Sequence, residues 1–103
     1  MTQTVFRAYC GLNGPHGDDG RETEREAIVV ELCQKWFPNG VTTYDAVGLW
    51  KGNNQERTIV VEVITDCANR DHDLMRRLAA EYKMLANQEA VMITRQEIEA
   101  DFV

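Results

Sequence analysis

Most of the side chains that could bind a ligand lie in two stretches, the glycine-rich residues 11–21 and the polar residues 66–72. Each stretch follows a predicted strand and leads into a predicted helix. Helix N-termini and glycine-rich backbone bind anions such as phosphate, and arginine pairs with them through its planar guanidinium group. We expect both loops to emerge at one edge of the sheet and to gather their side chains on one rim. The candidates there are His16, Arg21, Arg70 and His72, with Cys67 beside them.

Three interpretations of this rim stay open. The first is an anion site, although the glycines of residues 11–21 match no known phosphate-binding fingerprint. The second is a metal site that uses His16, His72, Cys67 and an aspartate, whose spacing is not a recognised ligand pattern. The third is a pair of ordinary solvated loops, in which Asn69 or Asp71 caps the following helix.

A second group of candidates lies on predicted strands rather than in loops. It combines an arginine, which suits phosphate, with aromatic rings, which suit stacking on a base. No serine–histidine–aspartate, cysteine–histidine or nucleophile-elbow motif is found, so we predict no catalytic residue, no metal ligand and no cofactor. The predicted ligand-binding residues are Arg7, Tyr9, His16, Arg21, Trp50, Arg70 and His72.

The composition is that of a single small globular domain, residues 1–103. A formal net charge of −6 argues against general binding of nucleic acid or of an anionic membrane. No apolar run is long enough to span a bilayer and no secretion signal is recognisable, so we expect a cytoplasmic protein. The three cysteines are widely spaced, which argues against a disulfide framework. We expect Cys10 and Cys33 to be buried and Cys67 to lie in a loop.

Hydrophobic periodicity predicts six elements. Alternation of apolar residues indicates strands, and spacing of three and four residues indicates helices. The predicted strands are residues 4–10, 41–50, 56–65 and 90–103, with a hairpin loop at 51–55. The predicted helices are residues 22–37 and about 71–87.

This order predicts an α+β, ferredoxin-like βαββαβ fold, in which two helices cover one face of a four-stranded antiparallel sheet. Phe6, Ala8 and Cys10, with alternate residues of 59–63, should face the helices. The open face should carry Arg7 and Glu62 as a pair, together with apolar side chains. Such a face favours self-association, so we expect a homodimer or a higher oligomer.

The chain turns from the first helix into the second strand at Phe37-Pro38-Asn39-Gly40-Val41-Thr42. This segment, the Gly48-Leu49-Trp50 end of the strand and Gln88-Glu89-Ala90-Val91 resemble a family of small bacterial or phage proteins of unknown function. The resemblance covers most of the chain. It implies a ferredoxin-like fold and carries over no catalytic residue.

Together these features favour a non-enzymatic, oligomeric binding module that holds a small anionic, nucleotide-like ligand. One alternative is an acidic, phage-encoded inhibitor of a protein partner. A second alternative is a cofactor-free dimeric enzyme with His16 or His72 as general base.

Overall fold

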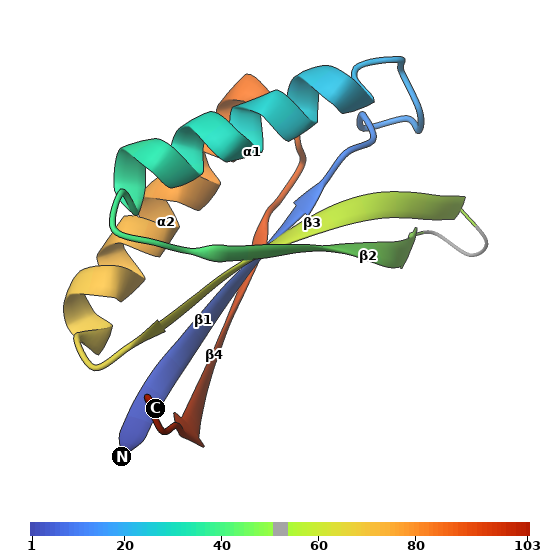
Figure 1. Ribbon diagram of the computed structural model, residues 1–103. Helices are drawn as coiled ribbons and strands as arrows, with labels where there is room; N and C mark the ends of the chain where they lie inside the picture. Colours follow the sequence, from blue (N-terminus) through green and yellow to red (C-terminus); the bar gives the residue numbers. More distant parts are fainter. Residues whose placement is uncertain (51–53) are drawn as a thin grey trace.

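The computed structural model, which describes residues 1–50 and 54–103, contains the six elements that the sequence predicts, in the predicted order (Figure 1). The ferredoxin-like prediction is confirmed, and the ends of most elements agree within a few residues. The elements are β1 (Thr2–Gly11), α1 (Glu22–Trp36), β2 (Thr42–Trp50), β3 (Asn54–Thr65), α2 (Ala68–Leu85) and β4 (Met92–Glu99).

The four strands form one antiparallel sheet in the order β2-β3-β1-β4, with both helices on one of its faces (Figure 1). In the centre, β1 runs antiparallel to β3, so that Thr4 lies opposite Thr65 and Gly11 opposite Thr58. The end of β1 therefore lies beside the beginning of β3. This antiparallel register decides which loops can form a common site.

The core lies between the helices and one face of the sheet. Alternating residues of β1 and β3, among them Phe6, Ala8 and Val61, are fully buried against α1 and α2, as predicted. Cys10 and Cys33 belong to this core, and Cys67 is exposed. Burial raises the pKa of Cys10 to about 12 and that of Cys33 to about 11, because a thiolate is poorly solvated there.

The open face is less apolar than the sequence suggests. Val5 and Val60 are each only 1% exposed. Ile64 and Tyr44 remain exposed. Arg7 and Glu62 form the predicted pair, with Nε and Oε2 2.8 Å apart. The self-association predicted from this face stays a prediction.

The corner after α1 has the predicted form. The helix ends at Trp36, just before Pro38, and Gly40 completes the turn with φ +135°, a conformation that favours glycine. Trp36 packs against the core, and the cations of Lys35 and Arg77 lie over its ring at 4.9 and 5.8 Å.

Three details of the elements differ from expectation. Helix α2 begins at Ala68 without a side-chain cap, so Asn69 and Asp71 lie inside it and do not cap it. The last strand is shorter than residues 90–103, because it pairs with β1 only over Met92–Glu99. Of the predicted hairpin loop, residues 51–53 lie outside the described residues, and β3 begins at Asn54. Within the described residues, no helix is long and apolar enough to cross a membrane.

Candidate functional site

The two loops expected to share a rim lie at opposite ends of the sheet. The prediction assumed that β1 and β3 end at the same edge. They are antiparallel, so residues 12–21 follow one end of the central strands while residues 66–67 follow the other. The prediction that His16 and His72 converge is therefore wrong, and Cys67 lies with His72, far from His16. Within the described residues, no cluster of three or more potential metal ligands is found.

The predicted residues at the far end of the sheet make local contacts. Arg70 pairs with Asp71, with Nε and Oδ1 3.1 Å apart. The ring of His72 stacks on the buried ring of Phe6, with centroids 5.4 Å apart and planes 6° apart. At the other end His16 is exposed, and Arg21 forms a bidentate pair with Glu24 at 2.8 and 3.0 Å. Arg70, His72 and Arg21 thus each have a partner within the chain.

A cavity of about 460 Å³ lies where β1 ends and β3 begins, a size suited to a small organic ligand. Of the predicted ligand-binding residues, Tyr9 lines it. Arg7 lies two residues away on the same face of β1, and the side chain of Trp50 lies outside the described residues. The lining residues are Tyr9, Gly11, Gly14, Pro15, Ala46, Val47, Gly48, Glu56, Thr58, Gln88, Glu89, Ala90 and Met92.

Glu56 places a partly buried carboxylate in this cavity. A β-carbon on Gly11 would lie 2.0 Å from its Oε1, so the absence of a side chain at Gly11 makes room for the carboxylate. The backbone N–H of Asn13 donates a hydrogen bond to it, and the side chain of Gln88 lies against Gly11 beside it. Burial raises the pKa of Glu56 above its ordinary value, since it disfavours the charged form more than this hydrogen bond favours it.

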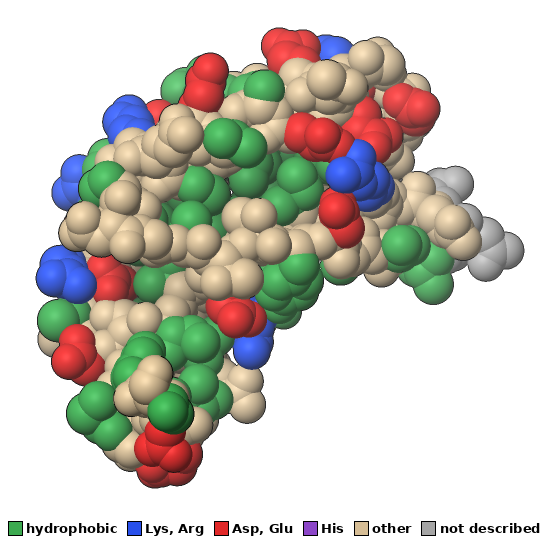
Figure 2. All heavy atoms as spheres, in the orientation of Figure 1, with side chains coloured by type: hydrophobic (Ala, Val, Ile, Leu, Met, Phe, Trp, Pro, Cys, Tyr) green, Lys and Arg blue, Asp and Glu red, His purple; other side chains and the backbone are tan. Residues whose placement is uncertain are grey.

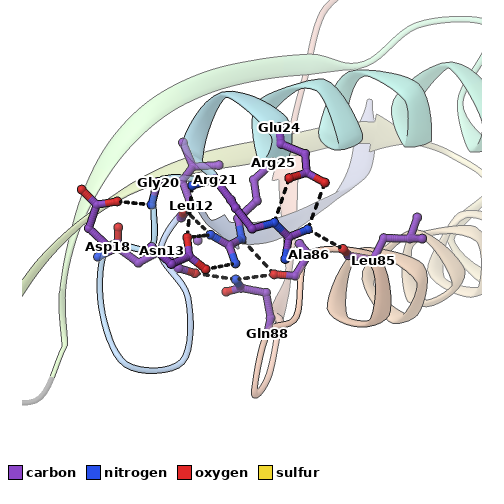
Figure 3. A network of polar contacts seen from close by, with 12 residues as sticks. Leu12, Asn13, Asp18, Gly20, Arg21, Glu24, Arg25, Leu85, Ala86 and Gln88 are labelled. Atoms are coloured by element: carbon purple, nitrogen blue, oxygen red, sulfur yellow. Dashed lines mark hydrogen bonds and ion pairs between the residues drawn. The ribbon is translucent and has the colours of Figure 1, made fainter.

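The buried side chain of Arg25 holds in place two segments of the chain that line the cavity. Its side chain is 0% exposed and donates to the carbonyl of Ala86 at 2.8 Å and to that of Leu12 at 3.1 Å. It also donates to both carboxylate oxygens of Asp19, at 2.5 and 2.8 Å. Figure 3 shows the guanidinium between the loop after β1 and the segment after α2. One buried cation thus holds two segments that are distant in the sequence.

Further hydrogen bonds tie the same segments together. The amide of Gln88 donates to the carbonyl of Asn13 at 2.7 Å (Figure 3). The buried hydroxyl of Tyr82 donates to the carbonyl of Gly11 at 2.5 Å. The loop that carries Gly14 and Pro15 is therefore anchored at several points, and the cavity is largely preformed.

Sequence reasoning missed both Glu56 and Arg25, although Arg25 gives a signal. Arg25 precedes Val29 by four residues and so lies on the buried face of α1. Glu56 shares its face of β3 with Val60 and Glu62, because side chains alternate along a strand. Because periodicity buries Arg25, this charged residue must have a partner. Glu56 lies on the open face with Glu62, where alternation predicts no burial.

The charges around the cavity suit a neutral or cationic ligand better than an anion. Among the described residues, those that line the cavity include two glutamates, Glu56 and Glu89, and no lysine or arginine. Acidic side chains also gather around the first turns of α1 and the neighbouring strands (Figure 2). There Arg57 is surrounded by carboxylates, pairing with Asp45 at 2.8 Å, with Glu22 at 2.8 Å and with Glu26. The anionic ligand predicted from the sequence does not match this site.

Comparison with protein families gives a match over residues 6–102 to the family described as "Protein of unknown function (DUF3574)". The chain belongs to this family. The resemblance seen in the sequence, to a family of unknown function, is thus supported at that level. A comparison with curated proteins gave no match.

Comparison with solved structures gives neighbours that share this fold. A phage SAM lyase in its apo state is 16% identical, with a TM-score of 0.65 over 97% of this chain and 91% of the lyase. A phage SAM lyase in complex with S-methyl-5'-thioadenosine is 14% identical, with a TM-score of 0.61 over 92% and 81%. A de novo designed protein, Foldit4, is 13% identical, with a TM-score of 0.54 over 98% and 100%. At these identities the likeness shows a shared fold.

These neighbours overturn one prediction. The sequence favoured a non-enzymatic binding module, whereas the natural proteins among these neighbours are enzymes, and one of them holds a thioadenosine. The error arose because the expectation rested on the absence of known catalytic motifs.

Proposed function

We propose that this protein is an enzyme that binds S-adenosylmethionine, or a sulfonium nucleoside of the same class, in the cavity beside Glu56 and cleaves a carbon–sulfur bond. The observation that carries the proposal is the cavity itself, which is preformed, lies on the open face of the sheet and is lined by carboxylates, an aromatic ring and glycine backbone. The shared fold with a phage SAM lyase supports it.

The nucleoside part of the ligand suits the end of the cavity near Glu56. Gly48 leaves the backbone of β2 uncovered at the cavity, since a β-carbon there would come no closer than 3.4 Å to a neighbouring atom, so that a flat ring system can approach it closely. The Glu56 carboxylate can accept hydrogen bonds from nucleoside N–H or O–H groups. The amide oxygen of Gln88 can accept them too, while its nitrogen already donates to the carbonyls of Asn13 and Ala86. The adenosine of such a ligand would thus fit this end of the cavity and find hydrogen-bonding partners there.

The sulfonium suits the neighbouring position over Tyr9. An aromatic ring attracts a cation through its negative face, and the acidic surroundings strengthen this attraction. When the carbon–sulfur bond breaks, the electron pair goes to sulfur, which becomes a neutral thioether and needs no proton. An oxygen of the substrate's own carboxylate supplies the electron pair for the new bond to the carbon that loses sulfur, which closes a cyclic ester, so no second substrate, metal or redox partner is required.

A turnover assay tests this proposal. Purified protein incubated with S-adenosylmethionine should release S-methyl-5'-thioadenosine faster than a protein-free sample, as measured by liquid chromatography and mass spectrometry. Gly48→Val should abolish turnover, because its methyl groups would extend into the cavity from a strand that tolerates valine.

The matched control is Leu49→Thr, which changes an exposed residue on the other face of the same strand and should leave turnover unchanged. No release above the protein-free rate, or full activity of Gly48→Val, would contradict the proposal.

A further inference from the structure

Arg7 and Glu62 form an ion pair on the same face of the sheet as the cavity. Arg7 precedes Tyr9 by two residues, so their side chains point to the same side, about 7 Å apart along the strand. Glu62 lies directly opposite Arg7 on β3. The pair therefore continues the floor of the cavity beyond Tyr9.

Neighbouring side chains hold this pair in one geometry. Arg7 Nε donates to Glu62 Oε2 at 2.8 Å, and Arg7 Nη1 donates to Gln96 Oε1 at 3.2 Å. The hydroxyl of Tyr44 donates to the same Glu62 Oε2 at 3.3 Å. The Arg7 and Glu62 side chains are still 27% and 18% exposed, so a ligand on this face can reach them.

Each partner keeps one atom for a further hydrogen bond. Among the described residues, no hydrogen bond is made by Nη2 of Arg7 or by Oε1 of Glu62. A guanidinium N–H donor next to a carboxylate acceptor is complementary to a group that itself carries a carboxylate next to an ammonium. That group is the zwitterionic end of an α-amino acid.

We propose that Arg7 binds the α-carboxylate and Glu62 the α-ammonium of a ligand whose nucleoside occupies the cavity. This inference rests on the proposed function and names the substrate class as nucleosides joined through sulfur to an amino acid. Arg7 lies four residues from Gly11 along β1, about 13 Å, which suits an extended ligand with a nucleoside at one end and an amino-acid group at the other. The sulfur then lies between them, over the Tyr9 ring.

Two thioethers separate this role from the rest of the site. S-adenosylhomocysteine and S-methyl-5'-thioadenosine share the adenosine and an uncharged sulfur, and only the first carries the amino-acid group. In isothermal titration the wild type should bind S-adenosylhomocysteine about tenfold or more tightly than S-methyl-5'-thioadenosine. Arg7→Gln should remove this advantage and leave the affinity for S-methyl-5'-thioadenosine unchanged.

The matched control is Arg77→Gln, which removes an exposed arginine paired with Asp73 on α2 and should change neither affinity. Because Arg7→Gln leaves the Glu62 carboxylate without its cation, the double variant Arg7→Gln/Glu62→Gln is measured as well. The double variant leaves no unpaired charge on this part of the sheet. It should likewise bind S-adenosylhomocysteine no more tightly than S-methyl-5'-thioadenosine.

Each outcome decides the inference. If Arg7→Gln lowers the affinity for both ligands equally, Arg7 only shapes the cavity. If Arg7→Gln still prefers S-adenosylhomocysteine as the wild type does, the ion pair plays no part in binding. Either result overturns the inference. Binding of S-methyl-5'-thioadenosine by the wild type without tighter binding of S-adenosylhomocysteine would overturn this inference alone. Binding of neither ligand would overturn the proposed function together with it.

Discussion

Glu56 is the residue on which the proposed nucleoside site most depends, and its position has a cost for stability. Its pKa is raised in the folded state, so the folded protein holds the Glu56 proton more tightly than the unfolded chain does. The contribution to stability is therefore most favourable at low pH. It is lost as pH rises from the ordinary carboxyl value of 4.5 through the folded-state pKa.

We therefore expect Glu56→Gln to raise the melting temperature by a few degrees at pH 7 and to have little effect near pH 4, because glutamine resembles the protonated acid. Differential scanning calorimetry between pH 4 and pH 7 measures the melting temperatures of the variant and the wild type. Glu89→Gln, which changes an exposed carboxylate at the same cavity, is the control and should show a much smaller difference. A lower melting temperature for Glu56→Gln at pH 7 would show that the carboxylate stabilises the fold.

At the scale of single residues, the sequence predicted an ion pair between neighbouring strands, but it did not predict which backbone groups a buried arginine would bind. The pairing of Arg7 with Glu62 followed from strand alternation and was confirmed at 2.8 Å. The role of Arg25 could not be predicted in the same way. Its acceptors, the carbonyls of Leu12 and Ala86, belong to the backbone of irregular segments, and hydrophobic periodicity says nothing of where such carbonyls lie.

At the scale of elements, the network around Arg25 joins the loop after β1 to the segment between α2 and β4. Asp19 supplies the matching charge, and its hydrogen bonds from Arg25 lower its pKa to about 2. For a carboxyl group with a lowered pKa, the stabilisation is present above the ordinary value of 3.8 and is lost as pH falls towards 2. The anchored loop should loosen in that acid range.

We predict that Asp19→Asn strongly lowers the melting temperature at pH 7, since it leaves the guanidinium of Arg25 buried without a counter-charge. The difference from the wild type should shrink as pH falls from about 4 to about 2, where Asp19 itself becomes protonated. Circular dichroism melts at several pH values measure this. Asp18→Asn is the matched control, because within the described part of the chain Asp18 accepts a hydrogen bond only from the backbone N–H of Gly20. Equal melting temperatures for the two variants would contradict this account.

The element order and the helix-facing residues were predictable because periodicity encodes them directly. The meeting of loops was not predicted correctly, because it depends on strand direction. In this fold β1 and β3 are antiparallel, so the loop that follows β1 meets the segment that precedes β4, and the loop that follows β3 lies at the other end. The cavity was missed for this reason, although Tyr9 was among the candidates.

At the scale of the whole molecule, the acidic surface and the open sheet face determine which ligands are plausible. A net charge of −6 and two glutamates at the cavity favour a cation or a neutral nucleoside over a phosphate. The helices cover the other face of the sheet, so the open face is the surface on which a ligand of this length can lie (Figure 1).

The most direct test of this account is to map where S-methyl-5'-thioadenosine binds. Titration into ¹⁵N-labelled protein, followed by amide NMR spectra, should shift the signals of Tyr9, Gly11, Gly48, Thr58 and Gln88, which line the cavity. The signals of Arg70 and His72, at the opposite end of the sheet, should stay unchanged. No shifts at saturating ligand, or shifts confined to the end with Arg70 and His72, would contradict the central claim that this cavity is a nucleoside site.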